Sequence, residues 1–172
     1  MTSKLKTDVL ETVSGSGTIA LTNQLSGMTS ASMPAGHILQ TVTSMSTTVN
    51  TTTSTSLVAT SHSVTITPSS ATSKILILHQ GMLNSQAAAQ WHFATLYRGS
   101  TNLAAGGAFD VMGGLYNQGS TDTHVPFPVN HLDSPNTTSA VTYTIYHKTT
   151  NNAVRYNADG WELYFTAIEI KG

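Results

Sequence analysis

Residues 41–70 read TVTSMSTTVNTTTSTSLVATSHSVTITPSS and contain no Lys, Arg, Asp or Glu. Thr, Val and Ile are stiff at the first side-chain torsion and fit the pleated surface of a β-sheet better than a helix. The uncharged region is longer than this stretch, because the nearest charged residues on either side are Glu11 and Lys74. The stretch therefore predicts β-strands whose surface lacks the charges that normally repel other protein surfaces.

The final residues, WELYFTAIEIKG (161–172), show the alternation of a strand. Leu163, Phe165 and Ala167 share one face with Trp161 and Glu169, whereas the other face holds Glu162, Tyr164, Thr166, Ile168 and Ile170. The second face is less polar than a solvent face should be, so we expect both faces to be covered. Further strands are predicted in HILQTVTSM (37–45), SVTITP (63–68), SKILILHQGML (73–83), AQWHFATLYRG (89–99) and SAVTYTIYHKTT (139–150).

Two other segments decide how these strands are connected. HVPFPVNHL (124–132) is predicted as an edge or extended segment, because Pro cannot donate a hydrogen bond to a neighbouring strand. The one candidate helical turn, NSQAAAQW (84–91), is interpreted as a loop or the start of a strand. Eight to ten strands separated by turn residues predict an all-β fold, an antiparallel jelly-roll-like sandwich.

The first 36 residues are predicted to form a short N-terminal β arm, separate from a head domain at 37–172. Two alternating runs flank the turn SGSG, and two strands cannot bury a face by themselves. The arm is therefore expected to be held by its own head, by a symmetry mate or by a larger assembly. Its apolar assembly residues are Leu5, Val9, Leu10, Ile19 and Leu21.

The composition excludes several classes of function. Charged residues make up 9% of the 172 residues, against about 25% in an average globular domain. The net charge of -1 gives no positive surface for nucleic acid. No apolar run is long enough for a membrane span, the N-terminus lacks a signal-peptide core, and the absence of Cys excludes disulfides.

A β protein with few charges on its strand edges is at risk of pairing with its neighbours. A defined oligomer solves this problem by covering those edges, and Thr pairs across strands stabilise such contacts without ion pairs. We therefore expect a homo-oligomer. The alternative is a monomer with an unusually Thr-rich surface.

The order of several segments resembles the β-rich terminal domain of tail-fibre-like and other virion structural proteins of tailed bacteriophages, especially those of marine bacteria. The resemblance covers about residues 34–172, and SKLKTDVLETVSGSGTIAL (3–21) is similar to the attachment segment that precedes such domains. A shaft between arm and head, which long tail fibres have, is missing. The segments are PAGHILQTV (34–42), VTITPSSATSKILI (64–77), LYRGSTNLA (96–104), LDSPNTTSAVTYTIY (132–146) and FTAIEI (165–170).

This resemblance implies a non-enzymatic virion structural protein, made in the host cytoplasm. The homotrimeric head would belong to a tail fibre or tail tip and contact a host-surface glycan or protein, while residues 1–36 bind other virion proteins. A capsid decoration or head-fibre protein is the alternative within virions. A small carbohydrate-binding, lectin-like module is the alternative of another class.

Recognition is predicted for a Gly-rich loop, AAGGAFDVMGGLYNQGS (104–120), because rigid β scaffolds carry binding residues on loops. The loop is expected to form a variable tip together with THVPFPVNH (123–131). The candidate contact residues are Phe109, Asp110, Tyr116, Asn117 and His124.

Other chemistry is not predicted from these residues. The seven His match no metal-ligand spacing, and those in strands are interpreted as buried or solvent-facing rings, so we expect no metal and no cofactor. HLDSP (131–135) crowds its Ser, His and Asp too closely for a catalytic triad. Trp91 and Trp161 are assigned to the core, with stacking on a sugar as the alternative. Paired carboxylates for glycoside cleavage would have to come from Asp110, Asp122, Asp133, Asp159, Glu162 and Glu169.

Overall fold

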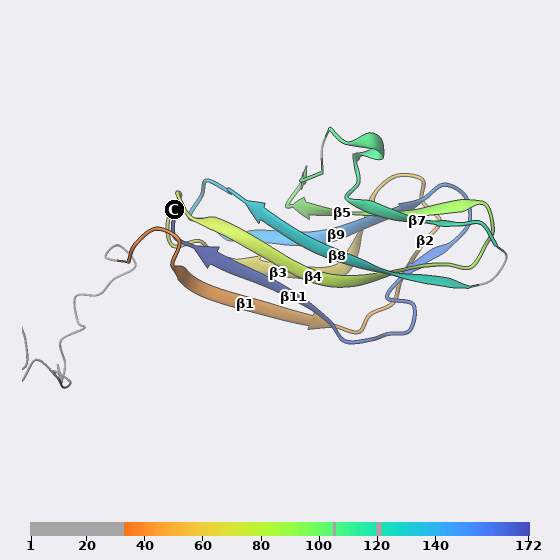
Figure 1. Cartoon of the computed structure of the whole chain (residues 1–172), viewed down its shortest axis with the longest axis horizontal. Helices are drawn as coiled ribbons and strands as arrows, with labels where there is room; N and C mark the ends of the chain where they lie inside the picture. The colour runs from red at the N-terminus through yellow and green to blue at the C-terminus, as the bar shows by residue number, and fades with distance from the viewer. Residues whose placement is uncertain (1–32, 105, 120–121) are drawn as a thin grey trace, which may run out of the picture. The chain divides into compact units, whose positions relative to one another are not determined.

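The structure is a computed structural model that describes residues 33–172 apart from residues 105, 120 and 121 (Figure 1). Eleven strands and one 3-10 helix form in these residues, which confirms the all-β prediction. The arm residues Leu5, Val9, Leu10, Ile19 and Leu21 lie outside the described part. The strands are β1 (Ile38–Ser46), β2 (Asn50–Thr52), β3 (Val58–Ile66), β4 (Lys74–Ser85), β5 (Gln90–Arg98), β6 (Thr101–Asn102), β7 (Gly113–Asn117), β8 (Thr123–Asp133), β9 (Val141–Thr149), β10 (Val154–Tyr156) and β11 (Leu163–Ile170), and the 3-10 helix is η3 (Ala108–Asp110).

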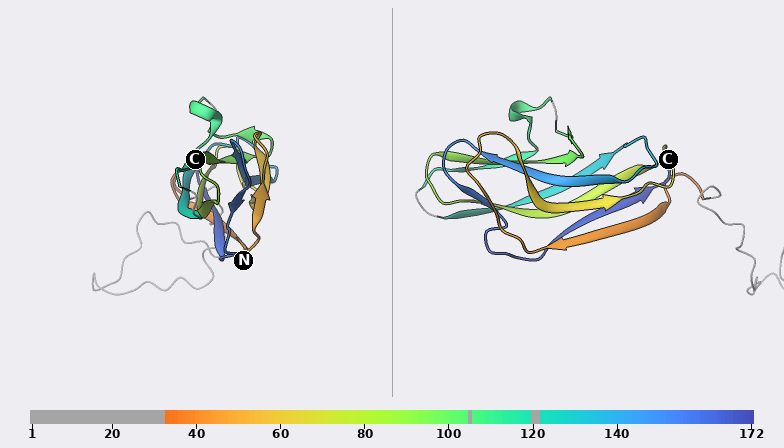
Figure 2. Two further views of the ribbon diagram at one scale, coloured as in Figure 1. Left: turned by 90° about the vertical axis from the view of Figure 1, so that its right-hand side faces the viewer. Right: turned by 180° about the vertical axis from the view of Figure 1, so that it is seen from behind.

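The strands form two antiparallel sheets that face each other (Figures 1 and 2). Sheet A has the order β1-β11-β4-β10-β2. Strands β11 and β10 pair with successive parts of one edge of β4, and β8 pairs with the whole opposite edge. Sheet B has the order β3-β9-β5-β6, and β7 also pairs with β5. Without the three shortest strands, β2, β6 and β10, the two orders become β1-β11-β4-β8 and β3-β9-β5-β7. Successive strands cross between the two sheets, except for β5 and β7, which pair with each other in sheet B, and this is the arrangement of an eight-stranded jelly roll. This part of the prediction is confirmed.

Strand β8 contains the two prolines of the predicted edge segment. It pairs along its length with β4, where Pro126 lies opposite Met82 and Pro128 opposite Gln80. No other described strand pairs with β8, so it is an edge strand as predicted. Pro is accommodated there because alternate N–H groups of an edge strand point away from the partner.

The first and last long strands lie side by side and join the two ends of the described fold. Ile38 of β1 pairs with Ile170 of β11. Beyond this pair, the Gly36 N–H donates to the Lys171 carbonyl at 2.8 Å, and the Lys171 N–H donates to the His37 carbonyl at 2.8 Å. The chain therefore enters and leaves the sandwich at neighbouring positions.

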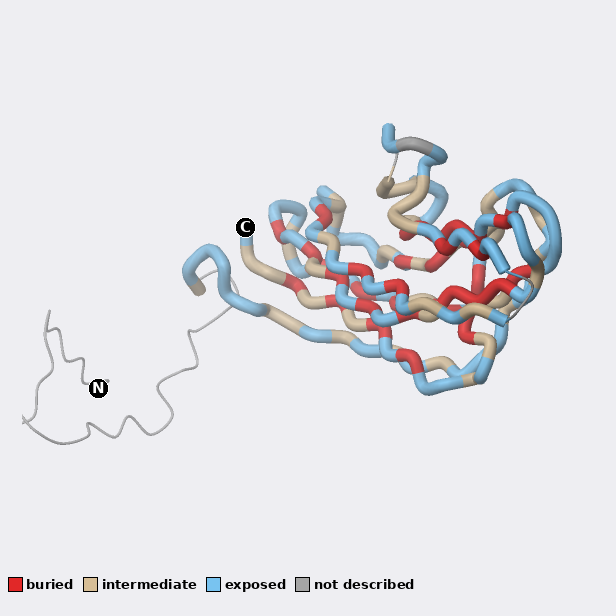
Figure 3. The backbone as a smooth tube through the Cα atoms, turned by 45° about the vertical axis from the view of Figure 1, so that its right-hand side comes forward, coloured by how far each residue is buried: buried red, intermediate tan, exposed pale blue. Residues whose placement is uncertain are grey.

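The core lies between the inner faces of the two sheets, where the buried segments of the chain concentrate (Figure 3). Alternation decides which residues enter it: on β11, Leu163, Phe165 and Ala167 are buried while Tyr164 between them is exposed. The predicted alternation is confirmed, but the expectation that both faces are covered is wrong, because Tyr164 is 54% exposed, and Trp161 is exposed as well. The core cluster also includes Val64 and Ile66 of β3, Ile75 and Ile77 of β4, Leu96 of β5 and Ile145 of β9.

A buried carboxylate, that of Asp133 at the end of β8, connects both sheets. Arg98 of β5 donates from Nη1 to its two oxygens at 2.7 and 2.8 Å, and the hydroxyl of Tyr143 of β9 donates at 2.7 Å. Burial, and then the Asp133 carboxylate, raise the pKa of Tyr143. The carboxylate thus satisfies a buried phenol and a partly buried guanidinium at once.

Asp133→Ala should lower the free energy of unfolding by about 2–3 kcal/mol, because it leaves Arg98 and Tyr143 without their shared partner. Urea denaturation at pH 7 measures the loss. Tyr143→Phe is the matched control, since it removes one hydrogen bond and should cost about 1 kcal/mol. Equal losses in the two variants would contradict a carboxylate that serves both partners.

Four histidines from four strands surround one tyrosine elsewhere in the interior. His62, His79, His92 and His147 are all buried, as is Tyr156 of β10. Nε2 of His79 lies 2.7 Å from the Tyr156 hydroxyl, and Nε2 of His92 lies 3.1 Å from Nδ1 of His147. The centroid of the Tyr156 ring is 5.1 Å from that of His62 and 6.2 Å from that of His147. We call these five residues the histidine cluster.

The histidine cluster is neutral at pH 7 because burial disfavours the charged imidazolium. Burial lowers the pKa of His79 and of His147 to about 4, and in both cases the neighbouring His62 adds to the effect. Burial, and then the adjacent His147, lower the pKa of His92 to about 3. The pKa of His62 is lowered by burial as well. These rings are core residues, one of the two outcomes expected for histidines in strands.

Candidate functional site

A row of four aromatic rings crosses the outer side of sheet B. On β5, His92 and Ala94 are fully buried between the sheets, so Trp91 and Phe93 point to the opposite face. Trp91 pairs with Tyr116 of β7, and their ring centroids are 4.9 Å apart. Trp91 also stacks on Phe93 at 5.2 Å, and Phe93 stacks on Phe109 at 5.1 Å. The order along the row is Tyr116, Trp91, Phe93 and Phe109.

Phe109 reaches this row from the loop that joins β6 to β7, which stands off the sandwich in Figures 1 and 2. Phe109 and Asp110 both adopt left-handed backbone conformations, with φ of 67° and 53°. This region is unfavourable for a bulky aromatic residue, and such strain persists only where surrounding contacts impose it. The loop is therefore built to hold Phe109 in this position.

Hydrogen bonds from two strands impose the loop conformation. Lys148 of β9 donates from Nζ to the Phe109 carbonyl at 3.1 Å, and Asn102 of β6 donates from Nδ2 to the Asp110 carbonyl at 2.7 Å. The Gly106 N–H donates to a carboxylate oxygen of Asp110 at 3.2 Å. The ammonium of Lys148 also lies 5.7 Å from the centroid of the Phe93 ring, within the range of a cation–π contact. The exposed Phe109 ring therefore has a fixed base.

An open groove of about 520 Å³ lies beside the loop, and we call it the sheet B groove. Its aromatic members are Phe109 and Tyr97, and the Tyr97 ring stacks on Tyr146 of β9 at 3.9 Å. One anionic side chain, Asp110, and one cationic side chain, Lys148, face it. The lining residues are Thr55, Ser56, Leu57, Tyr97, Asn102, Phe109, Asp110 and Lys148.

Two of the five predicted contact residues, Phe109 and Asp110, line the sheet B groove, and Tyr116 lies at the other end of the aromatic row. Asn117 lies at neither place, because alternation on β7 turns it into the core, where it is 2% exposed and donates to the Ser85 carbonyl at 3.0 Å. His124 is exposed but lies on β8 of sheet A, where Nδ1 is 3.4 Å from the Asp159 carboxylate. Of the two segments expected to form one tip, 104–120 contains strand β7 of sheet B and 123–131 lies in strand β8 of sheet A.

Three further site residues lie within strands and were not predicted to be there. Trp91 was assigned to the core but is 38% exposed, and Tyr97 and Lys148 were not singled out. Trp161, also assigned to the core, is 56% exposed and lies outside this row. The alternation of QWHFATLY already places Trp91, Phe93 and Tyr97 on one face. What the sequence does not show is which face of the strand meets the other sheet.

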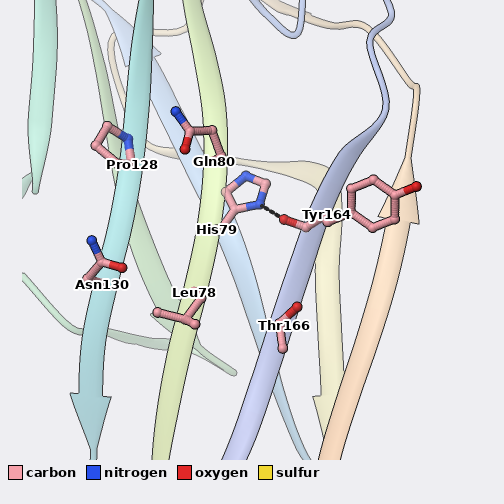
Figure 4. Close-up of a pocket in the computed structure, with 7 residues that line it drawn as sticks. All are labelled: Leu78, His79, Gln80, Pro128, Asn130, Tyr164 and Thr166. Atoms are coloured by element: carbon pink, nitrogen blue, oxygen red, sulfur yellow. Dashed lines mark hydrogen bonds between the residues drawn. The ribbon is translucent and has the colours of Figure 1, made fainter.

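The outer side of sheet A forms a second exposed surface, which we call the sheet A face. Its middle row runs from Thr43 through Thr166 and Leu78 to Asn130 across β1, β11, β4 and β8. A shallow hollow of about 280 Å³ lies on it, lined by Leu78, Pro128, Asn130, Tyr164 and Thr166 together with Gln80 and His79 (Figure 4). In Figure 4, His79 reaches toward the carbonyl of Tyr164, to which its Nδ1 lies at 2.8 Å.

The sheet A face combines apolar exposure with almost no charge. Its four long strands carry three residues of the Asp, Glu, Lys and Arg types, and Asp133 and Glu169 among these are buried, so Lys74 is the exposed one. The short strand β10 adds the partly buried Arg155. Strand β1 contains no charged or Pro residue that would protect its open edge. The large apolar residues exposed on these strands are Ile38, Met45, Leu78, Leu132 and Tyr164.

Across the described residues, no group of three or more His, Asp or Glu side chains is arranged to bind a metal ion. The described part of the chain also contains no helix long and apolar enough to cross a membrane.

The sequence matches no protein-family model and no curated protein. Similar folds occur in solved structures of infectious bursal disease virus. A mutant VP2 protein in derived T=1 particles is 10% identical, with a TM-score of 0.42 over 78% of this chain, and a chain of the Gt strain is 12% identical, with a TM-score of 0.46 over 91%. This chain spans 36% and 38% of those two proteins.

Proposed function

We propose that the protein is a non-enzymatic structural component of a bacteriophage virion. Its jelly-roll head associates with copies of itself through the sheet A face and presents the sheet B groove to a host surface. The single observation that carries the proposal is the sheet A face, which is exposed, rich in apolar and Thr side chains, and nearly without charge. Jelly rolls occur in viral capsid domains and in lectins, so the fold is suited to both display and binding.

A second copy of this chain is the partner that fits the sheet A face. An antiparallel sheet with one face in water normally alternates apolar residues inside with polar residues outside. Here Leu78, Leu132 and Tyr164 point outward, and a contact lined by Thr and apolar residues needs no complementary charges on its partner. The uncharged edge of β1 adds backbone groups that another strand can pair with. The resemblance to tail-fibre domains suggests that three copies associate.

The tail-fibre or tail-tip role is supported by the exposed groove on the opposite side of the sandwich. A head that assembles through sheet A leaves sheet B free, which suits attachment to a host. Residues 1–36 are assigned to binding other virion proteins. Labelling intact particles with an antibody against the head would locate the protein, and labelling of the capsid would favour the decoration-protein alternative.

Replacing Leu78 and Tyr164 together by Lys should convert the oligomer to a monomer. Two ammonium groups per copy would be buried without partners in the interface, which is strongly unfavourable. Light scattering should give three times the 18.1 kDa chain mass for the natural protein and 18.1 kDa for the variant. Thr138→Lys, on the exposed loop between β8 and β9, is the control and should remain trimeric. A natural protein that is monomeric at all concentrations would refute the assembly.

A lectin-like module is the second candidate, and the sheet B groove is the observation that favours it. The two candidates differ in assembly and location. A free lectin would bind sugar as a monomer and would be missing from purified virions, whereas the virion component would be found there by mass spectrometry.

A further inference from the structure

We propose that the sheet B groove binds a neutral pyranose unit of a surface glycan, with the sugar stacked on Phe109 and its hydroxyls bonded to Asp110. The inference deepens the proposed attachment function, on which it rests, by naming the class of ligand and the residues that bind it.

The groove contains an exposed aromatic ring, that of Phe109. Phe109 is 65% exposed, and one side of its ring is supported by Phe93 at 5.1 Å. A pyranose ring carries C–H groups on one face, and these pack favourably against the electron-rich face of an aromatic ring. Tyr97, backed by Tyr146, provides a second supported ring in the same groove. Stacking of this kind would cover apolar surface that the protein leaves in water.

Polar groups line the groove beside these rings. The Asp110 carboxylate accepts one described hydrogen bond, from the Gly106 N–H, and a carboxylate has capacity for several. The hydroxyl of Tyr97 and that of Thr55 have no hydrogen-bond partner among the described residues of the chain. Sugar hydroxyls both donate and accept, so a carboxylate and two hydroxyls match them well. An aromatic surface with a few polar groups is the usual composition of a small-molecule site.

Phe109 and Asp110 are already held in place in the protein without a ligand. Lys148 and Asn102 fix the carbonyls of Phe109 and Asp110, and the Gly106 N–H orients the Asp110 side chain. A ligand therefore does not have to order these two residues when it binds, and such ordering is a major cost of association. The strained backbone at Phe109 and Asp110 is also explained, since it places the ring and the carboxylate next to each other.

Charge distinguishes a neutral sugar from other ligands. The groove holds one anionic and one cationic side chain, and the ammonium of Lys148 already bonds to the Phe109 carbonyl and faces the Phe93 ring. A phosphorylated ligand or a nucleic acid requires an excess of positive charge, which this groove lacks. A purely apolar peptide would leave the Asp110 carboxylate desolvated.

The test is saturation-transfer NMR with the oligomeric protein and the methyl glycosides of glucose, galactose, mannose and N-acetylglucosamine at millimolar concentration. At least one glycoside should bind, and its affinity should fall about tenfold or more in Phe109→Asn and in Asp110→Asn. Asn tolerates left-handed backbone, so both variants keep the loop conformation. Trp161→Ala removes an exposed aromatic residue elsewhere and should leave the affinity unchanged.

The outcomes separate this inference from the assembly proposal. If no glycoside binds to the trimer, or if Trp161→Ala weakens binding as much as Phe109→Asn, the saccharide site is refuted while the virion role stands. If a monomeric natural protein binds the sugar through Phe109 and Asp110, the site stands and the proposed assembly is refuted. Both loop variants should keep the mass of the natural protein, and capture of peptides in place of glycosides would also overturn the assignment.

Discussion

Acidification from pH 7 to pH 5 should lower the free energy of unfolding of the head by several kcal/mol. The reason is that the histidines of the cluster bind protons in the unfolded chain but stay neutral while they are buried in the folded head. His79, His92 and His147 have pKa values of about 4, 3 and 4 in the folded state, against about 6.5 in an unfolded chain. Above pH 7 the rings are neutral in both states and contribute no pH dependence. Below pH 6.5 the unfolded state takes up protons first, so stability falls until the folded pKa values are reached.

The size of the effect follows from the number of rings. Each imidazole that is protonated only on unfolding adds up to about 1.4 kcal/mol of destabilisation per pH unit. The total stability of a domain is about 5–15 kcal/mol, so three or four such rings are enough to unfold it. The groups around the rings compensate only in part. Backbone carbonyls that bond to His62, His79 and His92 raise the pKa of these rings, but burial outweighs them and none of the bonded groups is a carboxylate.

Urea denaturation at pH 7.5, 6.5 and 5.5 measures this slope. Two carboxylates with shifted pKa values, those of Glu169 and Asp122, do not add to the slope in this range. Although burial opposes it, hydrogen bonds from Gln40 and Ser69 hold the pKa of Glu169 below its usual value, and a hydrogen bond from Asn84 does the same for Asp122. Both groups therefore lose their stabilising effect only at lower pH. His37→Gln, on the exposed segment before β1, is the matched control and should keep the slope. A stability that is constant from pH 7.5 to 5.5 would contradict buried neutral rings.

Gly81→Ala should unfold the head or cost it more than about 3 kcal/mol, the upper range for forcing extra volume into a packed core. A Cβ atom at Gly81 would lie 1.7 Å from the Tyr156 hydroxyl oxygen and 2.5 Å from the ring carbon that carries it. Tyr156 is fully buried and its hydroxyl lies 2.7 Å from His79, so the ring has no space to withdraw. Gly81 is thus required by the position of Tyr156 over β4.

Thermal unfolding followed by circular dichroism tests this prediction. Gly107→Ala is the matched control, because its Cβ would meet nothing closer than the Ala104 carbonyl at 3.7 Å, and its melting temperature should stay near that of the natural protein. If Gly81→Ala melts with the control, Tyr156 does not occupy the space above Gly81.

The fold was predictable where strands are long and alternate. HILQTVTSM, SKILILHQGML and the final strand gave the correct elements, and alternation placed Leu163, Phe165 and Ala167 on one face without showing that this face is the buried one. Short strands were missed: β10 has three residues in an Asn-rich segment, and β7 lies within the Gly-rich loop. Their strand conformation depends on pairing with β4 and β5, which are distant in sequence, and local propensity does not record such pairing.

The site was predictable only in part for a similar reason. Phe109 and Asp110 were found because a Gly-rich loop is a good place for binding residues. The prediction that Asn117 contacts a ligand was wrong because this part of the loop is strand β7. Alternation along β7 points Tyr116 to the solvent and Asn117 into the core. Trp91 was assigned to the core because large aromatic residues usually are buried, and a sequence does not show which side of a strand is covered by a second layer.

Ile38 pairs with Ile170, and Gly36 bonds to Lys171. The start of β1 and the end of β11 therefore lie next to each other. A short peptide could bridge them, and the chain could then be cut open in an exposed turn without changing which strands are neighbours, as in a circular permutant. A second protein fused before β1 or after β11 would likewise lie at the same end of the sandwich. The architecture thus separates where the domain is tethered from which of its faces are available.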